Sequence, residues 1–451
     1  MKAARNPPAN GHTRAWLLGI DKFPFLVYPL LADLSKKASV MPAEAQVEVT
    51  LREMVYGGAA LGRLADGRAL FVPYALPSER ALVEIVQEKA HYARGRLVQV
   101  LVPSPKRIQP RCPHFGECGG CHYQHLSYEE QVSLKAQLLV DQLQRIGAFH
   151  ALPELAIYPS PSEWHYRNSL QFHLTPEGKL GFRRAQSHET LPIQQCFLPL
   201  PPLIDLWQQI ELDPEAGVER VELRCDSDGN LLLVLESDHA EPPEVSVEEL
   251  PISVVHLSPA GSLVLAGSEY LWMEIKEQRL RLSAGAFFQV NAAVAGQIVD
   301  YLLAHLKLSP SDALLDVYCG GGLYSVFLAP RVGRLIGIES SPYACRDFEF
   351  NLDTFEQVEL YEATAEQVLA QLDLRPQTIL LDPPRSGLSQ TVREALARLA
   401  PPQIAYISCD PATFARDLRY LAQRGYRLEQ LAFFDMFPQT YHIETVGILR
   451  T

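Results

Sequence analysis

The sequence predicts an α/β protein with a small N-terminal β-barrel, a β-rich central domain and a C-terminal doubly wound α/β domain. Short β-type runs separated by glycine turns fill residues 46–103, and β-type runs return between residues 155 and 282. From residue 284 onward, apolar strands alternate with helical stretches, which is typical of a parallel sheet covered by helices on both faces. A chain of 451 residues is long enough for about three such cores.

Residues 1–42 show no sustained periodicity, and we expect them to form a flexible leader. Their longest apolar stretch, residues 16–31, is interrupted by Asp21, Lys22 and Pro24 and is too short to span a bilayer. No small-residue cleavage site of a secretory signal follows it. We therefore expect a cytoplasmic protein without membrane association. The net charge of -13 argues against non-specific coating of nucleic acid.

Residues 43–103 are predicted to form the barrel, because several short strands follow one another with glycine-rich turns between them. Cations without an intervening acidic residue run from this region into the next one: Lys89, Arg94, Arg96, Lys106, Arg107 and Arg111. A second stretch, residues 164–184, interleaves cations with aromatic residues such as Phe172 and Phe182. Cations beside aromatic rings can hold RNA phosphates and stack bases, and solvated strand faces are the alternative.

The central domain, residues 104–283, contains cysteines spaced like metal ligands. Cys112, Cys118 and Cys121 lie in one glycine-containing loop, and Cys196 in a later loop beside a proline is the candidate fourth ligand. In a cytosolic chain such a tight cluster indicates metal binding before a disulfide. The spacing alone leaves zinc and a four-iron cluster equally open, with free thiols as the third alternative.

A helix is predicted over residues 127–146, opened by Ser127 and Glu130 in the spacing of a capping box. In the C-terminal domain, residues 284–451, the first strand runs into the glycine turn Cys319-Gly-Gly-Gly322. Such a turn lets a ligand approach the backbone closely.

Two acidic residues end later strands of this domain. Glu339 ends the second strand, where a carboxylate can bind ribose hydroxyls, and Asp382 begins an Asp-Pro-Pro-Arg segment after the fourth. Together with the glycine turn they favour S-adenosylmethionine over NAD, with a purely structural turn as the alternative. Gln289, just before the first helix of the domain, could bind a ligand or cap that helix.

Cys409 follows a predicted strand, at the sheet edge where open α/β sheets bind ligands. A lone cysteine is more often a buried apolar residue, but this one precedes an Asp-Pro turn. A thiolate that adds to carbon 6 of uracil would make carbon 5 nucleophilic, and a base must then remove the carbon 5 proton. Glu444, near the C-terminus, is the candidate base.

Six motifs in order resemble the RNA uracil-5-methyltransferase family, in its iron–sulfur, TRAM-domain branch. They are Cys112-Pro-His-Phe-Gly-Glu-Cys-Gly-Gly-Cys121, Phe287-Phe-Gln-Val-Asn291, Asp316-Val-Tyr-Cys-Gly-Gly-Gly322, Asp382-Pro-Pro-Arg385, Ser408-Cys-Asp-Pro-Ala-Thr413 and Met436-Phe-Pro-Gln-Thr-Tyr-His-Ile-Glu444. The resemblance covers residues 46–451.

The resemblance implies that the barrel is an RNA-binding TRAM domain and that the C-terminal domain is a Rossmann-like S-adenosylmethionine methyltransferase. It implies catalytic roles for Cys409 as nucleophile and Glu444 as base, S-adenosylmethionine binding by Gln289, Tyr318, Glu339 and Asp382, and a [4Fe–4S] cluster on Cys112, Cys118, Cys121 and Cys196. It also implies that the helix at 127–146 packs on the catalytic domain. Leu323 and Ala363 depart from the family pattern, which commonly has asparagine at both places.

The implied substrate is structured RNA, with 23S ribosomal RNA expected first and the T-loop uridine of transfer RNA as the alternative. A noncatalytic RNA-binding protein on the same fold and a zinc-bound methyltransferase are further alternatives. We expect a monomer without an obligate protein partner.

Overall fold

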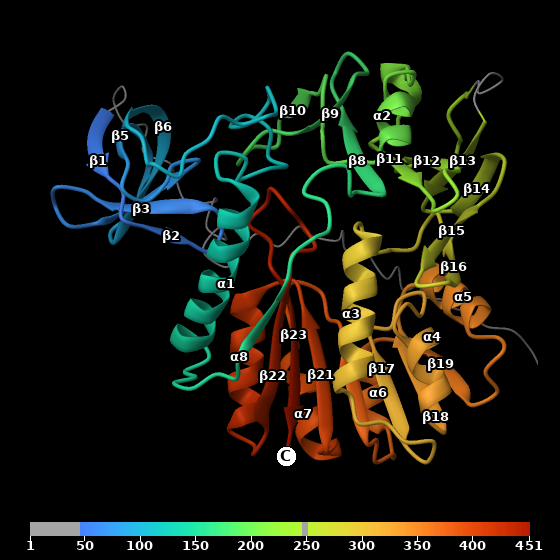
Figure 1. Ribbon diagram of the computed structural model, residues 1–451. Helices are drawn as coiled ribbons and strands as arrows, with labels where there is room; N and C mark the ends of the chain where they lie inside the picture. Colours follow the sequence, from blue (N-terminus) through green and yellow to red (C-terminus); the bar gives the residue numbers. More distant parts are fainter. Residues whose placement is uncertain (1–45, 246–250) are drawn as a thin grey trace, which may run out of the picture. The chain divides into compact units, whose positions relative to one another are not determined.

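The computed structural model describes residues 46–245 and 251–451 and arranges them around three large β-sheets (Figure 1). The predicted leader, residues 1–42, lies outside the described residues. Within the described ranges, no helix is both long enough and apolar enough to cross a bilayer.

The first sheet has six strands in the order β1-β5-β6-β4-β3-β2. Their bounds are β1 Gln46–Thr50, β2 Glu53–Val55, β3 Ala59–Arg63, β4 Ala69–Pro73, β5 Arg80–Glu88 and β6 Tyr92–Val102. Gly62 of β3 lies against Val49 of β1, where a Cβ on Gly62 would come within 2.6 Å of the valine side chain. The ends of the sheet therefore curl toward each other, which gives the small predicted barrel its shape.

The second sheet has seven strands in the order β10-β9-β8-β11-β12-β13-β14. Their bounds are β8 Ser169–Leu174, β9 Leu180–Arg183, β10 Thr190–Pro192, β11 Arg220–Cys225, β12 Leu231–Glu236, β13 Ile252–Ser258 and β14 Gly261–Ala266. Helix α2 (Pro201–Trp207) packs on it, and a 3₁₀ turn spans Pro214–Ala216. Phe172 is fully buried in this core and stacks on Phe182. Phe172 is therefore a core residue with Phe182 partly buried against it, which excludes the base-stacking alternative for Phe172.

The third sheet has eight strands in the order β19-β18-β17-β20-β21-β23-β22-β7. Their bounds are β7 Leu155–Tyr158, β17 Ala313–Val317, β18 Arg334–Glu339, β19 Val358–Glu362, β20 Thr378–Leu381, β21 Gln403–Ser408, β22 Arg427–Phe434 and β23 Glu444–Arg450. Strands β17 to β21 are parallel, and β23 is inserted antiparallel between β21 and β22. The hairpin β15 (Tyr270–Ile275) and β16 (Gln278–Ser283) precedes this domain.

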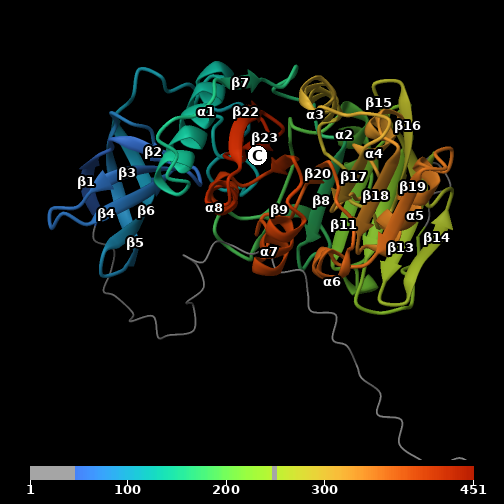
Figure 2. The ribbon, with the colours of Figure 1, turned by 90° about the horizontal axis from the view of Figure 1, so that it is seen from below.

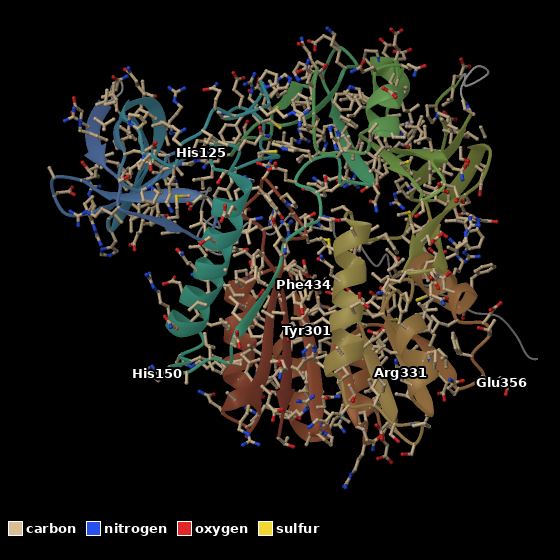
Figure 3. The ribbon with its side chains drawn as sticks, viewed as in Figure 1. His125, His150, Tyr301, Arg331, Glu356 and Phe434 are labelled. Atoms are coloured by element: carbon tan, nitrogen blue, oxygen red, sulfur yellow. The ribbon has the colours of Figure 1, made fainter. Side chains whose placement is uncertain are left out.

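Helices cover both faces of the third sheet, as predicted for a doubly wound domain (Figure 2). One face carries α3 (Ala292–His305), α4 (Ser325–Leu328) with the 3₁₀ turn Ala329–Arg331, and α5 (Pro342–Asn351). The other carries α6 (Ala365–Gln371), α7 (Gln390–Leu399) and α8 (Pro411–Ala422). Tyr301 of α3 meets Phe434 of β22 edge to face, with ring centroids 5.6 Å apart (Figure 3).

Helix α1 (Tyr128–Arg145) and strand β7 also belong to this third core. The apolar face of α1 packs against α8, and β7 extends the sheet by pairing parallel to β22. Residues 104–283 therefore contribute to the cores of all three large sheets, since Tyr123 and Leu126 pack in the core of the first one. The capping box at the start of α1 is only half formed, because Ser127 accepts the Glu130 N–H while the Glu130 carboxylate pairs with Lys106.

Two buried polar contacts fasten α1 to the loop between β22 and β23. The Lys135 ammonium lies 2.6 Å from the Asp435 carboxylate, with both side chains fully buried. The Gln131 side-chain amide donates to Gln439 Oε1, and the Gln439 N–H donates back to Gln131 Oε1, at 2.9 Å each. A loop that leads into the last strand of the sheet is thus held by a helix some 300 residues earlier in the chain.

We predict that Lys135→Ala lowers the free energy of unfolding by about 3–5 kcal/mol, because the Asp435 charge would stay buried without its partner. Lys106→Ala is the matched control, since its contact with Glu130 is also 2.6 Å long but lies at the surface. Its loss should be about 1 kcal/mol or less. Urea unfolding followed by circular dichroism measures both, and equal losses would contradict the prediction.

Candidate functional site

The parallel strands bring four predicted site residues to one edge of the third sheet. Tyr318 directly follows β17, Glu339 ends β18, Asp382 follows β20 and Cys409 follows β21. Carboxyl ends of parallel strands share one edge, which is where doubly wound sheets bind ligands. The structure therefore gathers these four residues although they span more than ninety positions of the sequence.

The glycine turn after β17 is built around Glu339. Tyr318 sits in the left-handed region with φ of 68°, and its N–H donates to the Ile338 carbonyl. One Glu339 oxygen accepts the Gly320 N–H at 3.1 Å, and the other accepts the Ser340 and Ser341 N–H groups at 2.7 Å each. The carboxylate thus fixes the turn and the start of α5 relative to each other.

A cleft of about 500 Å³ opens at this edge. Tyr318, Glu339 and Ala363 line it, together with residues 386–390 from the loop after β20. Ala363 donates its N–H to the Glu339 carbonyl. It lines the cleft, and its methyl side chain adds no polar group there. Leu323 is buried in the sheet core, which explains how an apolar residue is tolerated at that place in the turn.

Three acidic residues approach one another behind this cleft. Burial raises the pKa of Asp316 to about 7, opposed by the Ser325 hydroxyl that donates to Asp316 Oδ2 at 2.6 Å. Burial and the neighbouring Asp316 likewise raise the pKa of Asp382 to about 7. Burial and the charge of Asp382 raise the pKa of Glu444 well above its ordinary value, and Arg385 opposes this shift. Burial therefore disfavours the charged forms of all three carboxylates.

Two further features of the site lie beside these acids. Asp316 Oδ1 is buried and has no hydrogen-bond partner among the described residues. The hydroxyl of Tyr324 is buried near Asp382, Glu444 and Asp316, which together with burial raise the pKa of Tyr324 well above its ordinary value. Buried polar atoms without partners mark places where a bound group can complete the hydrogen bonding.

Gln289 lies in the loop between β16 and α3 and is almost fully buried. Asn291, not Gln289, caps α3, because its side chain accepts the Val294 N–H. The Asn168 side chain donates to the Gln289 carbonyl at 2.9 Å, which fixes this loop from the second sheet. The side chain of Gln289 lies beside Tyr324. This excludes the capping alternative for Gln289 and leaves its amide at the acidic cluster.

Cys409 directly follows β21, and Glu444 begins the neighbouring strand β23. The antiparallel register of β21 and β23 pairs Ser408 with Thr445, so the next position places Cys409 opposite Glu444. Opposed Cα atoms in such a pair are roughly 5 Å apart. Burial, Glu444 and Asp382 raise the pKa of the Cys409 thiol to about 12, while Arg385 lowers it. Glu444 is only 3% exposed, which excludes a solvent-facing strand glutamate.

Sequence reasoning missed Asp316, Arg385, Tyr324 and Tyr56 as separate site residues. Asp316 and Arg385 lie inside motifs 316–322 and 382–385 that the sequence analysis identified, so their place in these motifs could have indicated a role in the site. Tyr56 lies in the barrel, and its hydroxyl donates to Asp410 Oδ2 at 3.2 Å. No spacing in the sequence predicts this contact, because it joins residues 354 positions apart.

The four predicted cluster cysteines come together from two loops. The Gly119 N–H donates to the Arg183 carbonyl, and the Ala185 N–H donates to the Glu117 carbonyl, which seats the first loop on β9. Burial is the main cause that raises the pKa of Cys118 to about 11 and of Cys196 to about 12, and each also responds to other thiols of the group. The pKa of Cys121 rises through burial and through Cys196, Cys118 and Cys112.

The donor set around these thiols suits a metal–thiolate group. The Gly120 N–H points at Cys118 Sγ at 3.4 Å, and backbone or amide donors also face Cys112, Cys121 and Cys196. N–H donors to sulfur are a usual feature of iron–sulfur ligands. Within residues 46–245 and 251–451, however, no three potential ligands converge closely enough to hold one metal ion.

Comparison with known proteins adds family evidence to this geometry. A model described as tRNA (uracil-5-)-methyltransferase matches residues 245–451, and a TRAM domain model matches residues 44–98. An RNA methyltransferase of Aquifex aeolicus is 34% identical over 421 residues, which cover 89% of this chain and 98% of the relative. One from Halalkalibacterium halodurans is 32% identical over 456 residues, covering 92% and 99%. Both carry the description uncharacterized RNA methyltransferase.

Among solved structures, the chain resembles the tRNA (uracil-54, C5)-methyltransferase of Pyrococcus abyssi in complex with S-adenosyl-L-homocysteine. The TM-score is 0.69 at 23% identity, and the match covers 89% of this chain and 100% of that one. This likeness supports the fold. A TRAM barrel precedes the doubly wound domain in the sequence, and relatives match over nearly their whole length. The chain therefore belongs to the tRNA (uracil-5-)-methyltransferase family of RNA methyltransferases.

Proposed function

We propose that this protein transfers a methyl group from S-adenosylmethionine to carbon 5 of a uridine in structured RNA, with Cys409 as covalent nucleophile and Glu444 as base. The observation that carries the proposal is the register of β21 and β23, which sets Cys409 opposite Glu444 at the edge that also holds Asp382. A thiol suits addition to a ring, and a buried carboxylate beside it suits the removal of a proton afterwards.

The buried acidic group formed by Asp316, Asp382 and Glu444 favours S-adenosylmethionine as the ligand. Asp316, Asp382 and Glu444 are buried near one another, and burial penalises their charged forms. A cationic ligand relieves this penalty because opposite charges attract strongly in a poorly hydrated site. S-adenosylmethionine carries a sulfonium and an ammonium group, whereas the pyrophosphate of NAD would add negative charge. Glu339 and Tyr318 line the cleft, and Gln289 beside Tyr324 offers an amide to the same ligand.

The reaction then follows from the residues at the strand ends. The Cys409 thiolate forms a bond to carbon 6 of uracil, and the displaced electron pair makes carbon 5 nucleophilic. When bound, S-adenosylmethionine supplies an electrophilic methyl group. After carbon 5 is methylated, the Glu444 carboxylate removes its proton. The electrons left behind restore the carbon 5–carbon 6 double bond and release Cys409 as thiolate.

The raised pKa values fit this sequence of steps. Cys409 and Glu444 both favour their neutral forms, because burial and the nearby carboxylates penalise ionisation. Both must be ionised to act as nucleophile and base. A cation bound beside Asp382 would lower both pKa values, and Arg385 already acts in that direction. Ionisation of the catalytic pair is thereby linked to cofactor binding.

We predict that Cys409→Ala abolishes methyl transfer, because no sulfur is left to add to carbon 6. Glu444→Gln should still form the carbon 6 adduct but release it very slowly, since the carbon 5 proton stays in place. Denaturing gels of protein mixed with S-adenosylmethionine and labelled RNA would show a covalent band for Glu444→Gln and none for Cys409→Ala. The matched control is Cys225→Ala, a buried cysteine of the second sheet, which should keep normal activity. Methylation at normal rates by Cys409→Ala would contradict the mechanism.

We propose 23S ribosomal RNA as the substrate, on the strength of the resemblance to the iron–sulfur branch. The T-loop uridine of transfer RNA is the second candidate, because the structurally similar Pyrococcus abyssi protein is described as a tRNA (uracil-54, C5)-methyltransferase. A noncatalytic role is disfavoured, since the chain keeps Cys409, Asp382 and Glu444 together.

For the substrate we predict that a deletion strain loses 5-methyluridine at one or more positions of 23S ribosomal RNA and keeps it in transfer RNA. Mapping the modification in both RNA classes, with and without a plasmid copy of the wild-type protein, measures this. The Cys409→Ala variant should fail to restore the modification. Loss confined to transfer RNA would overturn the ribosomal assignment while leaving the chemistry intact.

We further propose that Cys112, Cys118, Cys121 and Cys196 hold a [4Fe–4S] cluster. In such a cluster each thiolate binds a different iron, so the four sulfurs need not converge on one point. The four thiols also lie near enough to influence one another's pKa values. The cluster would join the loop at residues 112–121 to the loop of Cys196. Methyl transfer is redox neutral, so we assign it a structural role.

If the cluster is present, protein purified without oxygen should be brown and contain iron and sulfide in equal amounts. Cys196→Ala should lose the visible absorption and most of the iron, because one iron would lose its thiolate. Cys225→Ala should keep both, because that cysteine lies away from the group in β11. Colourless protein with stoichiometric zinc would contradict the assignment and support the zinc alternative.

A further inference from the structure

The turn between β2 and β3 of the TRAM barrel reaches the catalytic edge of the third sheet. Tyr56 in this turn donates its hydroxyl hydrogen to Asp410 Oδ2 at 3.2 Å. Its ring packs against the third core, edge to face with Tyr441, at a centroid distance of 5.9 Å. The barrel thus places a side chain next to the residue that follows Cys409.

Asp410 determines the backbone of the segment that carries Cys409. Its Oδ1 atom accepts the N–H groups of Ala412 and Thr413 at 3.0 and 2.8 Å, which caps helix α8. Its own N–H donates to the Ser408 hydroxyl at 3.3 Å, and that hydroxyl donates to the Asp410 carbonyl at 3.1 Å. Cys409 lies between these two residues, so the orientation of Asp410 and the position of the thiol are coupled.

The approach of the barrel turn is close. Gly58 adopts a φ of 86°, and a Cβ on it would lie 3.3 Å from the Tyr441 ring and 3.4 Å from the His122 side chain. Tyr56 itself lies near Cys409 and Arg385: burial, Tyr441 and Cys409 raise the pKa of its hydroxyl, and Arg385 opposes this shift. The hydroxyl therefore stays a neutral donor, able to hold Asp410 Oδ2 while Oδ1 caps the helix.

We propose that Tyr56 is a positioning residue for the methyl transfer: its hydrogen bond to Asp410 holds the Cys409 segment in its reactive geometry. This inference rests on the proposed role of Cys409. It makes the RNA-binding barrel a part of the catalytic site, because a displacement of the turn would leave Asp410 Oδ2 without the Tyr56 donor. A hydrogen bond to a charged group is strong enough to affect the geometry of a site in this way.

The test compares Tyr56→Phe with Tyr92→Phe in the full-length protein. Tyr56→Phe keeps the ring and removes the bond to Asp410, so kcat should fall about tenfold, the size expected for one lost hydrogen bond to a charged group. KM for RNA and for S-adenosylmethionine should stay unchanged. Tyr92→Phe removes a hydroxyl from β6 of the same barrel, where the ring packs on Phe71, and should leave kcat unchanged.

Asp410→Asn tests whether the effect of Tyr56 passes through Asp410, because asparagine keeps a capping oxygen but replaces the acceptor of the Tyr56 hydroxyl by an NH2 group. If it does, the double variant Tyr56→Phe/Asp410→Asn should be no slower than Asp410→Asn alone, because both changes remove the same hydrogen bond. A second readout needs no RNA: the rate of Cys409 alkylation by iodoacetamide, followed by mass spectrometry of its peptide. Tyr56→Phe should slow it several-fold, and Tyr92→Phe should not.

Two results would overturn the inference. One is a raised KM for RNA with unchanged kcat and unchanged Cys409 alkylation, which would make Tyr56 an RNA contact only. The other is additivity of Tyr56→Phe and Asp410→Asn, which would show that Tyr56 does not act through Asp410. Neither would affect the proposed function, whose failure would appear as activity in Cys409→Ala.

Discussion

The antiparallel insertion of β23 between β21 and β22 is the constraint on which the site depends. In a purely parallel sheet the start of a strand lies at the edge opposite to the strand ends. Because β23 runs the other way, its first residue, Glu444, meets the end of β21, where Cys409 lies. One reversal of strand direction therefore brings the Glu444 carboxylate to the sheet edge that also holds Asp382 and Cys409.

The loop between β22 and β23, residues 435–443, is held by several segments from earlier in the chain. The Gln439 carbonyl accepts the N–H groups of His122 and Tyr123, which directly follow the last cysteine of the first loop. The Gln439 side chain bonds to Glu163 and to Gln131. Lys135 binds Asp435 at the start of the loop. Segments that precede the catalytic domain thus keep Glu444 in place.

Much of the fold follows from local patterns in the sequence. The alternation of apolar strands and helical stretches predicted after residue 284 corresponds to β17, β18, β20 and β21 with their helices, because continuous apolar runs between helices indicate buried parallel strands. The placement of β7 and α1 in the third core was not readable from such patterns, since it depends on packing between segments far apart in the chain. The resemblance to a family, and not periodicity, gave the expectation for α1.

The features of the candidate site also fall into those that the sequence predicts and those that depend on tertiary packing. Residues that follow strand ends, such as Asp382 and Cys409, could be located from the sequence, because a strand end fixes which edge they reach. The raised pKa values of Asp316 and Glu444 could not, since they arise from burial and from neighbouring carboxylates, Glu339 near Asp316 and Asp382 near Glu444. Tyr56 marks the limit of sequence reasoning, because a barrel turn carries no sign of the catalytic loop it contacts. The physical reason is that side-chain contacts between sheets are set by tertiary packing, which leaves no period in the sequence.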